Sequence, residues 1–108
     1  MRTTGIPTEV RQEAVDIIER FNREVLGDSG CRYVPHFRGK HLYLHREDFG
    51  KVGPVCRLEY KKRKQLWEFA IYKYSTDRYD PEDCFFPGSE FVDGTVEGAL
   101  AAGLTAYP

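Results

Sequence analysis

The sequence contains few cysteines and no long apolar run, and each of these shortages excludes a class of protein. Its three cysteines (Cys31, Cys56 and Cys84) lie far apart and form no CxxC pair. A full disulfide framework is therefore excluded, and we expect reduced thiols in a cytoplasmic protein. No stretch approaches the roughly 20 apolar residues of a membrane span, and residues 1–7 lack the apolar core of a secretory signal. We therefore expect a soluble protein that has no membrane partner.

Recognised catalytic and cofactor motifs are also missing. The sequence contains no phosphate-binding loop, dinucleotide fingerprint, metalloprotease helix or nucleophile elbow. It therefore predicts no catalytic residue and no particular cofactor, and an enzyme is the less favoured expectation. The chain has 108 residues, of which 41% are hydrophobic and 14% aromatic. This length and composition predict a single domain over residues 1–108 with a hydrophobic core of its own.

The net charge is close to zero, at -1, but the charges are unevenly distributed along the chain. Residues 31–64 carry ten Lys or Arg against three acidic residues, whereas residues 76–108 carry one Arg against seven acidic residues. The simpler interpretation is that the two regions lie near each other and that their charges offset. The alternative is a basic face that binds a polyanion. The near-zero overall charge favours the simpler interpretation.

The spacing of apolar residues predicts an α+β fold with an N-terminal helix, a four-stranded antiparallel meander sheet, a long loop and a short C-terminal helix. The expected elements are a helix over residues 8–26, a hairpin over 32–49, a turn over 50–54, strands over 55–60 and 66–75, a loop over 76–92 and a helix over about 95–106. A period of 3.6 residues identifies the helices and a period of two the strands. The first helix has an apolar stripe of Val10, Ala14, Ile17, Ile18, Phe21 and Val25.

The hairpin turns at Gly39-Lys40, and this fixes which side chains share a face. In that register Arg38 faces His41 and Val34 faces His45. The buried face then carries Tyr33, Pro35, Phe37, Leu42 and Leu44. We expect the first helix to cover this face; if the final helix covers only part of the opposite, outer face, a cleft remains there. Because Pro35 cannot donate a ladder hydrogen bond, its strand is expected at an edge. An edge strand can pair with that of a second copy, so the sequence is compatible with both a monomer and a homodimer.

The outer side of the hairpin carries all three histidines and suggests a metal site made of His36, His41 and His45. His36 lies diagonal to both of the others, at about 7–8 Å between backbone positions, and His41 and His45 are roughly 13 Å apart along one strand. Because metal–nitrogen bonds are about 2.0–2.1 Å long, an ion reaches two of these imidazoles more easily than three. The alternative is a solvated polar face without metal.

The wider outer face suggests a binding surface. Its candidate binding residues are Tyr43, Arg57, Glu59, Glu68, Tyr72 and Tyr74. Tyrosines beside charged groups suit binding, because each ring offers apolar area and a polar tip. The sequence therefore favours a non-enzymatic binding or interaction module that uses the outer sheet face and the 76–92 loop, with an unknown ligand or protein partner. The alternative is a small metal-dependent or other enzyme that uses the histidines.

The basic hairpin over residues 57–64, with Trp67 nearby, suggests a lesser alternative, nucleic-acid binding. The order of helix, strands and helix resembles that of double-stranded RNA-binding domains, which have one helix, three strands and one helix. That family carries a lysine-rich motif at the start of its last helix. The corresponding residues here, 93–98, are acidic, which makes nucleic acid the less favoured partner.

Overall fold

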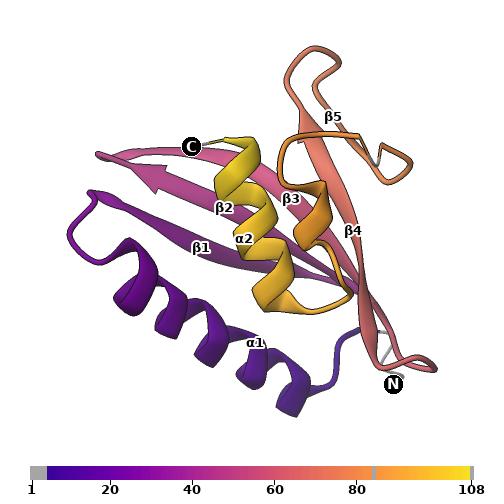
Figure 1. Ribbon diagram of the computed structural model, residues 1–108. Helices are drawn as coiled ribbons and strands as arrows, with labels where there is room; N and C mark the ends of the chain where they lie inside the picture. The colour runs from indigo at the N-terminus through magenta and orange to yellow at the C-terminus, as the bar shows by residue number, and fades with distance from the viewer. Residues whose placement is uncertain (1–4, 84, 108) are drawn as a thin grey trace.

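The computed structural model describes residues 5–83 and 85–107, which form an antiparallel sheet with two helices on one face (Figure 1). The elements are α1 (Thr8–Phe21), a π-helix (Asn22–Leu26), β1 (Cys31–Arg38), β2 (His41–Asp48), β3 (Lys51–Lys61), β4 (Leu66–Lys73), β5 (Arg78–Asp80), a 3₁₀ turn (Ser89–Phe91) and α2 (Val96–Ala106). The strands lie in the order β1-β2-β3-β4-β5. The α+β class is confirmed, with five strands instead of the predicted four. Cys84 and residues 1–4 lie outside the described residues.

The β1–β2 hairpin has the predicted register. Arg38 pairs with His41, and the pairing continues through Val34 opposite His45. Gly39 has a φ of 61°, as the first central residue of a type II′ turn requires. The alternation of buried and outer side chains that was expected from the sequence is therefore confirmed for this hairpin.

The predicted turn over residues 50–54 is wrong, because β3 already begins at Lys51. The chain reverses one step earlier, at Phe49 and Gly50, which both have positive φ. Pro54 lies inside β3, where the pairing with β2 shifts by one residue next to His45. Val55 is the extra residue of this bulge, and a bulge is one of the few places in a sheet where a neighbouring proline is tolerated.

The fifth strand lies within the segment expected to be a loop. β4 ends at Lys73, and the chain turns back so that β5 pairs with Ile71–Lys73 only. Three residues give too little alternation to be recognised in a sequence. Between β5 and α2, the described residues have no regular structure except the 3₁₀ turn. α2 begins at Val96, with Thr95 as its cap. The predicted final helix is therefore confirmed.

Both helices pack on the same face of the sheet (Figure 1). Tyr33, from the inner face of β1, is almost fully buried and donates a hydrogen bond from its hydroxyl to the Leu100 carbonyl of α2 at 2.8 Å. Gly103 makes this close approach possible, because a Cβ there would lie 2.6 Å from Val55 and 2.7 Å from the Tyr33 hydroxyl. The final helix therefore does not cover the outer face, and no helix of the described residues lies over that face.

The helix predicted to reach residue 26 ends in one π-turn, closed by the Gly27 N–H donating to the Asn22 carbonyl at 2.8 Å. The extra residue of this turn rotates Val25 into solvent, at 57% exposure, and Leu26 into the core, at 5%. The assignment of Val25 to the apolar stripe is therefore wrong. No helix in the described part of the chain is both long and apolar enough to cross a bilayer.

Candidate binding site on the outer face of the sheet

The outer face is the side of the sheet opposite α1 and α2, and strand pairing places most of the predicted binding residues on it. Tyr43 of β2 pairs with Arg57 of β3, and Glu59 of β3 pairs with Glu68 of β4. Tyr72 follows on the same face of β4. Five of the six predicted binding residues therefore share one surface, which extends over three strands.

Tyr79 of β5 brings these residues into contact and forms what we call the tyrosine cluster, consisting of Tyr43, Tyr72 and Tyr79. The Tyr79 ring lies 5.5 Å from the Tyr43 ring and 5.1 Å from the Tyr72 ring, measured between centroids. The Arg57 guanidinium carbon lies 5.3 Å from the centre of the Tyr79 ring, a cation–π distance. Burial, and then the nearby Tyr43, raise the pKa of Tyr79 to about 12. The phenol therefore keeps its proton well into the alkaline range and can donate a hydrogen bond.

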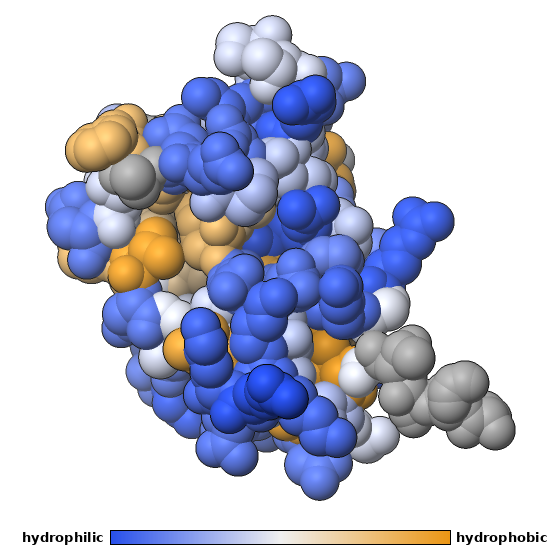
Figure 2. Space-filling view, turned by 90° about the vertical axis from the view of Figure 1, so that its right-hand side faces the viewer, coloured by the Kyte–Doolittle hydropathy of each residue, from blue (hydrophilic) through white to orange (hydrophobic). Residues whose placement is uncertain are grey.

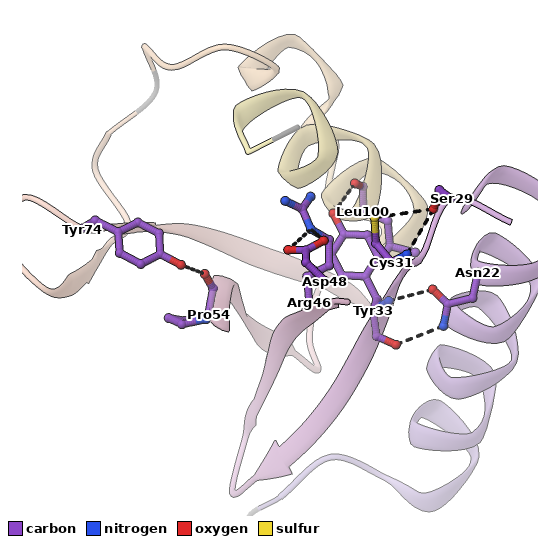
Figure 3. A network of polar contacts seen from close by, with 9 residues as sticks. All are labelled: Asn22, Ser29, Cys31, Tyr33, Arg46, Asp48, Pro54, Tyr74 and Leu100. Carbon is purple, nitrogen blue, oxygen red and sulfur yellow. Dashed lines mark hydrogen bonds and ion pairs between the residues drawn. The ribbon is translucent and has the colours of Figure 1, made fainter. Parts of the chain in front are cut away.

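Tyr74, the sixth predicted binding residue, lies at the rim of this surface. β4 ends before it, and its hydroxyl donates to the Pro54 carbonyl at 2.9 Å (Figure 3). The centroid of its ring lies 4.8 Å from that of Tyr72 and 5.4 Å from that of Tyr107. Tyr74 therefore connects the outer face to the C-terminal end of α2.

The two predicted glutamates differ in how strongly they are paired with cations. Glu59 lies 2.9 Å from the Lys61 ammonium, 3.1 Å from that of Lys40 and 3.7 Å from the His41 imidazole. The hydrogen bond from Lys61 is the main reason that the pKa of Glu59 falls to about 2. Glu68 is 54% exposed and lies 3.8 Å from Lys61. Glu68 is therefore the carboxylate that is more available to a ligand.

The histidines lie on the outer face as predicted, but only two of them are close to each other. The His36 and His45 rings are 6.4 Å apart, whereas His41 contacts Tyr43 at 5.9 Å. Burial lowers the pKa of both His41 and His45, with further lowering by Arg57 and His36 respectively. Among the described residues, no three His, Cys, Asp or Glu side chains are grouped to share an ion. The metal site therefore stays a prediction.

A cleft of about 540 Å³ lies where the outer face meets the segment 81–94. Its lining residues are Arg57, Glu59, Leu66, Trp67, Glu68, Phe69, Ala70, Pro81, Asp83, Phe86, Ser89, Val92, Asp93 and Gly94. This volume is in the range typical of ligand sites. Figure 2 views the molecule from the β4–β5 side and shows apolar side chains among hydrophilic ones at this edge of the sheet. Three of the predicted binding residues, Arg57, Glu59 and Glu68, thus belong to the cleft.

Sequence reasoning missed the part of the site contributed by the chain after β4. Tyr79 was assigned to a loop, although the turn-forming residues 75–77 followed by Arg-Tyr-Asp are a weak hairpin signal. Phe86 stacks on Phe69 with ring centroids 5.6 Å apart, and no sequence pattern indicates this pairing. The stacked rings fix the far wall of the cleft against β4.

The chain matches no protein-family model, no curated protein and no solved structure. What can be inferred about its function therefore depends on the side chains described above. In the basic hairpin, Lys61 is paired with Glu59 and Glu68, whereas Lys62, Arg63 and Lys64 are exposed. The nucleic-acid alternative also stays a prediction.

Proposed function

We propose that this protein is a non-enzymatic binding module whose ligand site is the cleft beside β4 together with the adjoining tyrosine cluster. The observation that carries the proposal is that a cleft of ligand size runs along the edge of β4, where the sheet meets the segment 81–94. Aromatic rings, carboxylates and Arg57 border this cleft. Such a mixture provides apolar contact area and a few oriented polar groups, which are what a binding site needs.

The same residues give less support to catalysis. Cys56 is fully buried, and burial raises the pKa of its thiol, so it is a poor nucleophile. Glu59 is already held by cations, and its lowered pKa makes it a weak base. None of the histidines is among the lining residues of the cleft. Binding therefore requires fewer additional assumptions than turnover.

Nuclear magnetic resonance tests the proposal in a single experiment. A mixture of amino acids, short peptides, nucleotides and sugars is added to isotope-labelled protein, and the amide signals are followed. We expect the compounds that bind to shift the signals of Arg57, Glu68 and Val92, and we expect the signals of the compounds themselves to stay constant for hours. Steady conversion of a compound would show instead that the protein is an enzyme.

A matched pair of variants locates the site. Ser89→Phe places a ring at the cleft, whereas Ser75→Phe makes the same change in the exposed turn before β5. We expect Ser89→Phe to weaken binding by about tenfold or more, equivalent to about 1.4 kcal/mol, and Ser75→Phe to leave it unchanged. Equal affinity in both variants, or shifts confined to other surfaces, would contradict the proposed site.

A further inference from the structure

The sheet has an open stretch at its β4 edge. β4 runs from Leu66 to Lys73, but β5 pairs only with Ile71–Lys73. The segment Leu66–Ala70, about 13 Å long at 3.3 Å per residue, therefore lies beyond the end of β5. We call this segment the open edge. Its one described backbone hydrogen bond to the following segment joins the Trp67 N–H to the Gly94 carbonyl at 2.9 Å.

Phe69 provides an unused pair of backbone groups at the open edge. In an antiparallel strand, alternate residues direct their N–H and C=O to the same side. Phe69 lies two residues after Trp67, so its N–H and C=O also point away from β3. Among the described residues, no hydrogen bond from outside the sheet reaches these two groups. An edge with free groups of this kind is a template for another strand.

The cleft provides space beside this backbone. All five residues of the open edge line it. Because consecutive side chains of a strand point to opposite faces, five in succession share a cleft when it runs along the edge of the strand. The opposite wall is formed by residues of the segment 81–94, among them Pro81, Ser89 and Val92.

We propose that the ligand is an extended, basic peptide segment of a partner protein, which adds to the sheet as a strand paired with Phe69. This inference depends on the proposed binding function and deepens it by naming the ligand class. Four carboxylates and a single guanidinium line the cleft. Glu59 and Asp83 are paired with Lys61 and Lys73, which leaves Glu68 and Asp93 against Arg57, so the lining favours a cationic segment. A Lys or Arg opposite Glu68 on the outer face forms a favourable cross-strand pair.

Charge also argues against a second copy of this chain as the occupant. Two open edges that pair antiparallel around Phe69 bring their Glu68 side chains to diagonal positions, about 7–8 Å apart. Two like charges then lie close together, and no cation of the edge itself separates them. A basic residue of a partner is attracted to Glu68 at this position, whereas the Glu68 of a second copy is repelled.

The first test uses two capped heptapeptides, one with alternating lysine and valine and one in which glutamate replaces each lysine. We expect the lysine peptide to bind at least tenfold more tightly and to slow hydrogen exchange of the Phe69 amide at least tenfold. Glu68→Lys should reverse this preference, whereas Glu24→Lys, with the same charge change on the exposed π-helix, should not. Unchanged Phe69 exchange at millimolar lysine peptide would overturn the proposal.

The second test separates strand addition from side-chain binding alone. Two versions of the lysine peptide are N-methylated on alternate amides, one at its lysines and one at its valines. Because alternate amides of an added strand face the sheet and the solvent, one version should lose at least tenfold in affinity and the other little. Equal losses in both versions would overturn strand pairing.

The outcome for the inference is distinguishable from that for the proposed function. Small compounds that shift the Arg57 and Val92 signals while the lysine peptide leaves Phe69 exchange unchanged would overturn strand addition and support the binding site. Compounds and peptides that all act on other surfaces would overturn both.

Discussion

The two edges of the sheet differ in how their backbone groups are satisfied. At the β1 edge, the Asn22 side-chain amide accepts from the Tyr33 N–H at 2.8 Å and donates to the Tyr33 carbonyl at 3.0 Å (Figure 3). Pro35, two residues further on, has no N–H. At the β4 edge, Phe69 has no such partner among the described residues. One edge is thus closed by its own chain, whereas the other keeps a backbone pair free next to a cleft.

This difference makes the open edge the one that is available to a further strand. Proteins commonly protect edge strands, because free ladder groups promote aggregation. Here a side chain from the π-helix, a proline and charged flanking residues protect β1. A similar effect at Phe69 would require only a longer β5. Substitutions at either edge test whether this contrast holds.

Asn22→Ala should break the closed edge and cause the largest loss of stability. The substitution leaves two backbone groups of the buried Tyr33 without partners, and such groups cost about 1–3 kcal/mol. Urea unfolding should therefore show a lower midpoint with an unchanged slope. Gln12→Ala, on the exposed side of α1, serves as the control and should change stability by less than about 0.5 kcal/mol. A loss no greater than that of the control would mean that Asn22 does not protect the edge.

Arg46→Met should stabilise the protein on the side of the closed edge. Arg46 pairs across the strands with Tyr33, is 6% exposed, and has an Nη1 atom without a hydrogen-bond partner among the described residues. Asp48 contacts the Nε atom at 3.4 Å (Figure 3). Replacing a poorly paired buried charge by an apolar side chain of similar length is expected to raise the free energy of unfolding by about 1 kcal/mol. A fall of more than 1 kcal/mol in calorimetry would show that the guanidinium is well satisfied.

Glu59→Gln should change the pH dependence of stability on the side of the open edge. The pKa of Glu59 is about 2 in the folded protein, below its ordinary value of 4.5. A carboxyl whose pKa falls on folding contributes stability above its unfolded pKa and loses it as the pH falls through its folded pKa. We therefore expect the variant to lose on the order of 1 kcal/mol at pH 7 and to lose less than the unchanged protein between pH 5 and pH 2. Parallel stability curves over that range would contradict this linkage.

Self-association gives the smallest expected effect and compares the edges directly. Glu68→Val removes the carboxylate from the open edge, and Pro35→Val restores an N–H to the closed edge. Each should change stability by less than about 0.5 kcal/mol. We expect Glu68→Val to dimerise at lower concentration than Pro35→Val in analytical ultracentrifugation, because Asn22 still covers the β1 edge. Dimerisation of Pro35→Val at the lower concentration would show that the β1 edge is the more available of the two.

The sequence predicted the β1–β2 hairpin well, because a two-residue turn and a strict alternation of apolar side chains determine the register together. It failed where the local signal was weak or misleading. Gly53 and Pro54 suggested a turn but lie at a bulge, and a three-residue β5 has no detectable period. Val25 was misplaced because a π-turn adds one residue to the helical repeat.

The candidate site was predicted only on the side contributed by regular strands. Arg57 and Glu68 were assigned to the outer face from alternation alone, and both line the cleft. Phe86 and Val92 come from a segment whose path is determined by tertiary contacts such as the stacking on Phe69. The position of α2 could not be predicted either, because a helix made of small residues has no face that identifies its partner.

The position of Trp67 gives the molecule an intrinsic fluorescent probe in the wall of the candidate cleft. The chain contains one tryptophan, and it lines the cleft with its ring 5.1 Å from that of Tyr60. Light absorbed selectively by indole therefore reports on the surroundings of a single site, without any label. A change in emission wavelength or intensity on titration is thus a rapid first screen, which a bench spectrometer can perform before any isotope is incorporated.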